Sequence, residues 1–199
     1  MLSEVEASKI KYQIVKRMVN NRWGVISQKT VYKAKLFEVK EQKVLLPDNK
    51  KHVYEIVEKR PTVNIFPLDD KYDLYLISQY RYMFKRRILE AVAGHVDENE
   101  TSLAAAKREL QEEAGIVASQ WEEIARIETA ASVIKATSHL FLARDLEQGM
   151  PNPDIGEDIQ LVKLHLEEAV AKVMSGEINN AATMIGIFIL DNLVRGKRV

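Results

Sequence analysis

Three glutamates, Glu109, Glu112 and Glu113, lie close together in the segment GHVDENETSLAAAKRELQEEAGI, which spans residues 94–116. On a helix with about 100° between successive residues, these three side chains share one face. The adjoining face is apolar and consists of Leu103, Ala106, Leu110 and Ala114. Like charges at i,i+3 and i,i+4 repel, and each pair costs about 3 kcal/mol at about 5.5 Å and an effective dielectric of about 20. Something in the protein or in the solvent must offset this repulsion.

The crowded glutamates have two interpretations. The first is a solvated surface helix rich in Glu and Lys, on which salt screens the repulsion. The second is a site for a hard divalent cation, because clustered carboxylate oxygens on a rigid element suit Mg²⁺, which takes water and phosphate oxygens as further ligands. Composition alone does not choose between these two interpretations.

The elements around the glutamates are those of a layered domain. We predict a helix over residues 101–114, with Thr101 or Ser102 as its N-cap and Gly115 as its left-handed end. Two further helices are predicted over residues 166–174 and 181–194. Strands are predicted at TVNIFPL and YDLYLISQYR, joined as a hairpin, and at ILEAVAG, WEEIARIE, SHLFLARDL and IQLVKLHL. This order favours an α+β or mixed-sheet domain over a doubly wound one.

The first 59 residues have a different pattern. Residues 3–20 place apolar side chains at helical spacing among charged ones, which predicts a short amphipathic helix. Residues 24–59 are rich in β-forming residues and contain a PDNKK turn, which predicts a small antiparallel meander. We therefore divide the chain into an N-terminal helix and β lobe, residues 1–59, and a main domain, residues 60–199.

The composition excludes several classes of protein. The 29 basic and 29 acidic side chains cancel, so neither nucleic acid nor an anionic membrane is expected as a partner. The absence of cysteine excludes disulfides and thiolate chemistry, and the four histidines show no ligand spacing. No apolar run reaches the roughly 18 residues of a membrane span, and the N-terminus lacks the apolar region of a signal peptide. We expect a cytoplasmic protein.

Residues 94–116 also fit a family signature: Gly, five residues, Glu, seven residues, Arg-Glu, an aliphatic residue, any residue, Glu-Glu, any residue, Gly and an aliphatic residue. The chain resembles the Nudix hydrolases at every one of these positions. Chance agreement at seven fixed identities has a probability on the order of 10⁻⁸ per start position. The resemblance therefore favours the cation site, within a Nudix-type α/β/α sandwich with a mixed sheet.

The resemblance implies roles for the residues of this signature. Glu109, Glu112 and Glu113 are implied to be metal ligands, joined by the backbone carbonyl near Ala93 and Gly94. The implied ion is Mg²⁺, with Mn²⁺ as a possible replacement. The family hydrolyses a nucleoside diphosphate joined to another group, and the metal would bridge the diphosphate oxygens and activate water.

Two more residues of the signature are implied to support these ligands. Glu100 would contribute to the metal site through water or a further cation. Arg108 lies i,i+4 from Glu112 and would orient the ligand carboxylates. We therefore place Arg108 with Glu109, Glu112 and Glu113 in the catalytic group.

Outside the signature, segments over about residues 24–196 resemble bacterial ADP-ribose pyrophosphatases, which are homodimers that cut ADP-ribose to AMP and ribose 5-phosphate. By this resemblance Arg81 would contact the diphosphate, Glu90 would hydrogen-bond substrate, and Lys59 or Arg60 could assist. The N-terminal lobe would serve dimerisation and binding of the base. The candidates for stacking on the base are Tyr32 and Phe37, although aromatic residues in a meander more often pack in a core.

One departure from the family affects the substrate. Ala130-Ala131-Ser132 replaces a usual Ser-Pro-Gly loop, and Ala136 stands where a metal-binding or water-activating glutamate is usual. Glu128 and Glu157 are the nearest acidic candidates for its role, and His139 is given no site role. The alternatives to ADP-ribose hydrolysis are hydrolysis of another nucleotide sugar, such as GDP-mannose, and a non-catalytic nucleotide-binding Nudix protein.

Overall fold

The computed structural model describes residues 23–152 and 158–197, which form two compact units. The first unit holds residues 23–59 together with residues 131–135. The second unit holds residues 60–130 and the described residues from 136 onward. The helix predicted over residues 3–20 lies outside the described residues.

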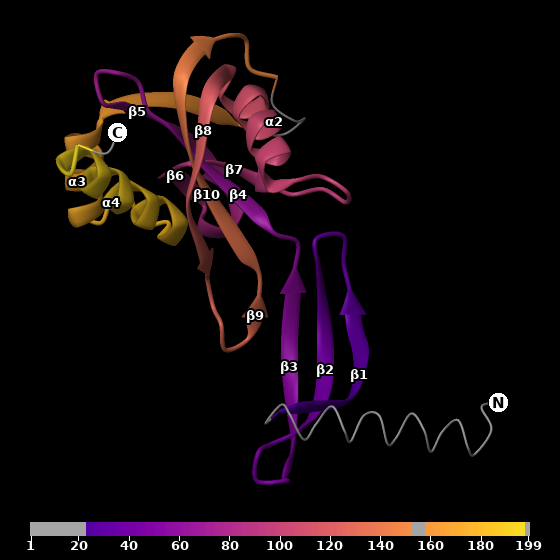
Figure 1. Cartoon of the computed structure of the whole chain (residues 1–199). Helices are drawn as coiled ribbons and strands as arrows, with labels where there is room; N and C mark the ends of the chain where they lie inside the picture. The colour runs from indigo at the N-terminus through magenta and orange to yellow at the C-terminus, as the bar shows by residue number, and fades with distance from the viewer. Residues whose placement is uncertain (1–22, 153–157, 198–199) are drawn as a thin grey trace. The chain divides into compact units, whose positions relative to one another are not determined.

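The first unit is an antiparallel meander of β1 (Gly24–Lys33), β2 (Phe37–Leu45) and β3 (Lys51–Lys59), which lie side by side in Figure 1. This arrangement confirms the meander expected over residues 24–59. A short strand, β9 (Ile134–Lys135), adds to the sheet by parallel pairing with β3. The sequence did not predict this strand, because two residues carry no alternation pattern and its partner is distant along the chain.

The second unit contains two sheets. The first is mixed and has the strand order β7-β4-β10-β8, in which β4 and β10 run parallel. The second is antiparallel and has the order β11-β5-β6. The strands are β4 (Thr62–Pro67), β5 (Asp73–Arg81), β6 (Arg86–Glu90), β7 (Val92–His95), β8 (Ile116–Glu128), β10 (Thr137–Gln148) and β11 (Ile159–His165). A 3-10 turn, η1 (Tyr82–Phe84), connects β5 to β6.

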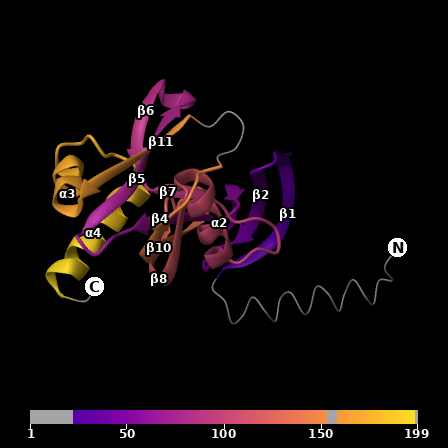
Figure 2. The same ribbon diagram turned by 90° about the horizontal axis from the view of Figure 1, so that it is seen from above.

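Helices cover the mixed sheet on both sides. Figures 1 and 2 show α2 (Ser102–Ala114) on one side, and α3 (Leu166–Met174) and α4 (Ala181–Arg195) on the other. Strand β4 serves both faces, because Ile65 packs in the core beneath α2 whereas Phe66 packs in the core beneath α3 and α4. Burial on both faces explains the nearly continuous apolar run of this strand. The expected α+β fold, with a mixed sheet between helical layers, is confirmed.

Two details of the predicted sheet are wrong. The strands β4 and β5 do not form a hairpin, since they belong to different sheets and share one bridge, between Leu68 and Leu74. The segment ILEAVAG is not one strand, because β6 ends at Glu90 and β7 begins at Val92. Both errors have the same cause, because a local pattern identifies a strand but not the strand that it pairs with.

The ends of α2 agree with the prediction. The Thr101 side-chain oxygen accepts a hydrogen bond from the Ala104 backbone N–H at 3.1 Å, which makes Thr101 the N-cap. Gly115 follows the helix with φ = 65° and its N–H bonds back to the last turn. A Cβ at Gly115 would also collide with the backbone of Pro151, so both conformation and space require glycine there.

Candidate active site

The glutamates of α2 lie against the edge strand β7. Glu113 is only 6% exposed, and its Oε2 accepts a hydrogen bond from the Ala93 backbone N–H at 3.1 Å. The Glu109 carboxylate lies so close to Gly94 that a Cβ at this position would overlap it. The helix and the strand therefore fix two carboxylates beside the backbone of residues 93–94, where the sequence predicted a metal site.

Arg108 is the centre of an ionic network with the acidic residues. Its Nη1 donates to Glu109 at 2.7 Å and to Glu112 at 3.0 Å. Its Nε and Nη2 each donate to Glu100 at 3.1 Å, and Nη2 also donates to the His95 carbonyl at 3.0 Å. One guanidinium thus offsets the repulsion among three carboxylates and ties α2 to the loop after β7.

This network favours the charged forms of Glu100 and Arg108. The pKa of Glu100 lies below its ordinary value, chiefly because Arg108 donates to its carboxylate and also because the Asp97 backbone N–H does. The pKa of Arg108 lies above its ordinary value, chiefly because Glu100 accepts from it, with further contributions from Glu109 and Glu112. Glu100 and Arg108 therefore both stay charged at neutral pH.

The donor set of this site fits a hard divalent cation. Carboxylate oxygens of Glu109, Glu112 and Glu113 and a backbone carbonyl at Ala93 are the ligand types that Mg²⁺ prefers. Gly94 leaves room for the Glu109 carboxylate beside the strand. Among residues 23–152 and 158–197, no three His, Asp or Glu side chains are grouped so that they could hold a metal ion as they stand. Arg108 is hydrogen-bonded to two of the three glutamates, Glu109 and Glu112.

The second group of predicted residues meets on the antiparallel sheet. Arg81 Nε donates to Glu90 Oε1 at 2.6 Å, and the other Glu90 oxygen accepts from Asn180 Nδ2 at 3.3 Å. Glu90 is only 4% exposed, and a buried carboxylate needs a partner of opposite charge. Arg81 is this partner. The structure thus makes Glu90 a residue that orients Arg81, whose guanidinium is partly exposed and can meet an anion.

The sequence analysis missed Asn180. Its side-chain oxygen caps α4 by accepting from the Thr183 backbone N–H at 3.1 Å, and its amide nitrogen reaches Glu90. Thr183 in turn accepts a hydrogen bond from the Ala91 backbone N–H at 3.0 Å. The signal in the sequence was the polar pair before the last apolar helix, which marks a cap but not its distant partner.

The remaining predicted residues have the following places. Lys59 ends β3 in the first unit, whereas Arg60 begins the second unit and pairs with Asp97 at 3.2 Å and Glu98 at 3.6 Å. Arg60 therefore braces the loop that also carries Glu100. Lys59 thus belongs to the first unit, whereas the glutamates of α2 belong to the second.

The aromatic candidates of the first unit contact each other. The ring centroids of Tyr32 and Phe37 are 5.8 Å apart, and both side chains are exposed rather than packed in a core. A role in stacking on a base stays a prediction.

The candidates for the missing loop glutamate are placed differently. Glu128 ends β8 and accepts from Thr137 Oγ1 at 2.8 Å, and Ala136 lies between β9 and β10. Glu157 lies outside the described residues. His139 bonds to Glu123 at 2.7 Å, and the pKa of Glu123 is lowered to about 2, chiefly by hydrogen bonds from Arg126.

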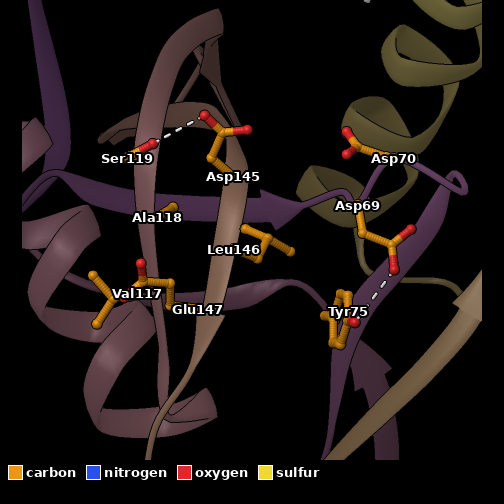
Figure 3. Close-up of a pocket in the computed structure, with 9 residues that line it drawn as sticks. All are labelled: Asp69, Asp70, Tyr75, Val117, Ala118, Ser119, Asp145, Leu146 and Glu147. Atoms are coloured by element: carbon orange, nitrogen blue, oxygen red, sulfur yellow. Dashed lines mark hydrogen bonds between the residues drawn. The ribbon is translucent and has the colours of Figure 1, made fainter.

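A pocket of about 750 Å³ lies at the carboxyl ends of β4 and β10, whereas Gly94 pairs with the amino end of β4. Figure 3 shows its lining, in which Tyr75 bonds to Asp69 and Ser119 bonds to Asp145. Its acidic lining residues are Asp69, Asp70, Asp145 and Glu147, and none of its described lining residues is basic. None of the predicted site residues lines this pocket, so we do not place the substrate there.

A carboxylate-bearing helix docked on a strand beside a held arginine defines a site for metal-assisted reactions of phosphate esters. A model of the NUDIX domain matches residues 58–182. The ADP-ribose pyrophosphatase of Mycobacterium tuberculosis (strain ATCC 25618 / H37Rv) is 29% identical over 182 residues, which are 90% of this chain and 88% of the relative. The ADP-ribose pyrophosphatase of Bacillus subtilis (strain 168) is 27% identical over 164 residues, 81% of this chain and 89% of the relative.

A solved structure shares the fold as well. The crystal structure of an ADP compounds hydrolase superposes with a TM-score of 0.78 and 25% identity, covering 90% of this chain and 98% of that chain. The chain therefore belongs to the Nudix domain family and is a Nudix hydrolase enzyme. Nudix hydrolases generally use a divalent metal ion, in agreement with the donor set beside Gly94. No helix among the described residues is long and apolar enough to span a membrane.

Proposed function

We propose that the protein hydrolyses the diphosphate of ADP-ribose to give AMP and ribose 5-phosphate, in a reaction that depends on Mg²⁺. The observation that carries the proposal is the docking of Glu109 and Glu113 against residues 93–94 by the signature helix. Two relatives that cover most of the chain are ADP-ribose pyrophosphatases, which supports ADP-ribose as the substrate. Mn²⁺ is the expected substitute for Mg²⁺.

The chain's own residues supply binding and orientation. Glu109, Glu112 and Glu113 would hold the metal together with the Ala93 carbonyl, with Glu100 in a supporting role. Bound Mg²⁺ offsets charge on the diphosphate oxygens and lowers the pKa of a bound water. Hydrolysis of a diphosphate needs little beyond placement and charge stabilisation, which a fixed carboxylate cluster would provide together with its metal ion.

Arg81 is the proposed binding group for the diphosphate. Its Nε is held by Glu90, whereas its terminal nitrogens donate to no residue in the described part of the chain. A guanidinium whose orientation is fixed by a buried carboxylate loses little freedom when it binds a phosphate. Arg108 would keep the ligand carboxylates in place, a role that its hydrogen bonds to Glu109 and Glu112 support.

Product analysis tests the substrate assignment. Wild-type protein is incubated with Mg²⁺ and either ADP-ribose or GDP-mannose, and nucleotides are separated by chromatography. We expect AMP and ribose 5-phosphate from ADP-ribose at a higher kcat/KM than GMP from GDP-mannose. A higher kcat/KM on GDP-mannose would mean that another nucleotide sugar is the preferred substrate. Thermal stabilisation by the ligand without any product would indicate a nucleotide-binding protein that does not catalyse hydrolysis.

A single substitution tests the metal assignment. Glu113→Gln keeps an oxygen that can accept from the Ala93 N–H, so we expect an intact fold and loss of hydrolysis in Mg²⁺. Circular dichroism and the melting temperature check the fold, and the same product assay checks activity. The control is Glu122→Gln on the exposed part of β8, which should behave as wild type. Wild-type turnover by Glu113→Gln contradicts the assignment.

We further propose a homodimer in which the N-terminal lobe serves association and binding of the base. In the described part of this lobe Val44 is the one buried apolar side chain, whereas several large ones are exposed. They include Trp23, Val25, Ile26, Val31, Tyr32 and Val53. Strands that expose this much apolar surface favour association with another protein surface. The cytoplasmic location expected from the sequence stays a prediction.

A further inference from the structure

Gln79 carries a buried oxygen that the fold leaves unused. The residue lies on β5 and is 6% exposed. Among residues 23–152 and 158–197, its Oε1 is the one buried side-chain oxygen or nitrogen without a hydrogen-bond partner. An acceptor left in this state destabilises the fold relative to one that is paired. Such a group in a folded protein calls for an explanation, and binding of a ligand is one.

The nearest sheet neighbours of Gln79 do not supply the missing donor. Its cross-strand partners are Ile88 on β6 and Ile159 on β11, and neither side chain carries an N–H or O–H group. Along β5, the nearest residues on its face are Ile77 and Arg81. Arg81 Nε is already bonded to Glu90. The donor must therefore come from Arg81 after a change of its bonding, from water, or from a ligand.

The position of Gln79 favours the ligand. Glu90 pairs with Ile77 across the strands, so Gln79, Arg81 and Glu90 all project from the same face of one sheet. Both Glu90 oxygens are engaged, by Arg81 and by Asn180. Gln79 Oε1 is thus the unpaired acceptor in the group that holds the proposed diphosphate-binding arginine, and because this oxygen is buried, a ligand reaches it only when the side chains around it move.

Chemistry narrows the ligand group that Gln79 can bind. An ionised diphosphate has acceptor oxygens only, so the amide oxygen cannot bind the group that Arg81 binds. Residues 79 and 81 are about 7 Å apart along the strand, at about 3.4 Å per residue. A sugar attached to the diphosphate lies within this reach and carries hydroxyl donors.

We propose that Gln79 accepts a hydrogen bond from a hydroxyl of a sugar next to the diphosphate and so makes the enzyme selective for hydroxylated nucleotide sugars. This inference rests on the proposed function, since the sugar is positioned by the diphosphate. Binding of the sugar then gives the buried Gln79 oxygen a hydrogen-bond donor. An analogue without the hydroxyl leaves this oxygen unpaired. Sites built on such a hydrogen bond reject analogues that lack the group far better than apolar sites reject a change of size.

The test compares Gln79→Met with wild type on ADP-ribose and on analogues in which one ribose hydroxyl is replaced by hydrogen. Wild type should lose at least about tenfold in kcat/KM on one analogue, about the effect of one hydrogen bond. Gln79→Met should lose a similar factor on ADP-ribose and show no further loss on that analogue. Because the substitution removes an unpaired acceptor, its melting temperature should equal or exceed that of wild type.

Two controls keep the test decisive. Gln160→Met changes an exposed glutamine on the neighbouring strand β11 and should alter neither kcat/KM nor the melting temperature. Gln79→Leu replaces the first variant if Gln79→Met fails to fold. Gln79→Met that discriminates among the analogues as wild type does, or that melts lower with unchanged kcat/KM, overturns the inference.

The same measurements separate this inference from the proposed function. Wild-type protein that hydrolyses ADP-ribose while Gln79→Met matches it on every analogue overturns the role of Gln79 alone. Wild-type protein that neither hydrolyses ADP-ribose nor gains thermal stability from it overturns both proposals.

Discussion

At the scale of single residues, the site depends on where negative charge is allowed to accumulate. Glu109, Glu112 and Glu113 repel one another, and Arg108 relieves part of this repulsion through two of them. Glu113 differs from the others, because it is buried and accepts from a backbone N–H. Burial on one side and an arginine on the other hold the carboxylates as a fixed set of oxygen donors.

The glycine opposite Glu109 has a testable role at this scale. Gly94→Ala adds a Cβ where the Glu109 carboxylate lies, so we expect the carboxylate to shift and kcat/KM to fall by about tenfold or more, at least about 1.4 kcal/mol. Steady-state kinetics with Mg²⁺ measure the change. In a Glu109→Ala background the same substitution should cost little, because the displaced group is gone. Full additivity of the two losses would contradict this explanation.

At the scale of elements, α2 brings the glutamates to β7 because both its ends are defined. Thr101 caps the first turn and Gly115 ends the last one in a conformation that favours glycine. Ala106, Leu110 and Ala114 of the apolar stripe pack in a core, whereas Leu103 is exposed. These features fix the rotation of the helix, and with it the direction of its acidic face.

Removal of the cap tests this dependence. Thr101→Ala deletes the acceptor for the Ala104 N–H and should destabilise the protein by about 1 kcal/mol, which lowers the melting temperature by about 2–4 °C. Ser102→Ala is the matched control, because Ser102 is the next residue and is not the cap. Differential scanning calorimetry compares the two variants. Equal melting temperatures would show that Thr101 does not stabilise the helix.

At the scale of the whole molecule, the two units differ in the number of apolar side chains that they bury. The second unit has two apolar clusters, one beneath α2 and one beneath α3 and α4. The first unit consists of strands whose apolar side chains are largely exposed. A sheet with so little buried surface gains stability when it associates, which is why we expect a dimer.

The dimer prediction is checked by mass in solution. At micromolar concentration, light scattering after size exclusion should give twice the chain mass of 22.8 kDa. Val31→Lys places a charge on the lobe at a side chain that is 60% exposed in the single chain, so it should shift the mass toward the monomer. Val117→Lys, at a side chain 49% exposed in the second unit, is the control. A wild-type monomer removes the prediction.

The sequence by itself determined the local part of this protein. The helix over 101–114, its cap, its end and the shared face of its glutamates follow from spacing along one element, because a helix is built from contacts three and four residues apart. The signature spacing from Gly94 to Ile116 was enough to indicate the family. The meander over residues 24–59 was likewise visible in alternation and turn residues.

Only the tertiary structure decided what distant segments do together. It joined Arg81, Glu90 and Asn180 into one group, separated β4 from β5, and left Gln79 without a donor. The physical reason is that strand pairing depends on the packing of whole layers, which no short window of sequence contains. The chemistry of the carboxylates was thus legible in the chain, whereas the surroundings of the proposed substrate appeared only in the fold.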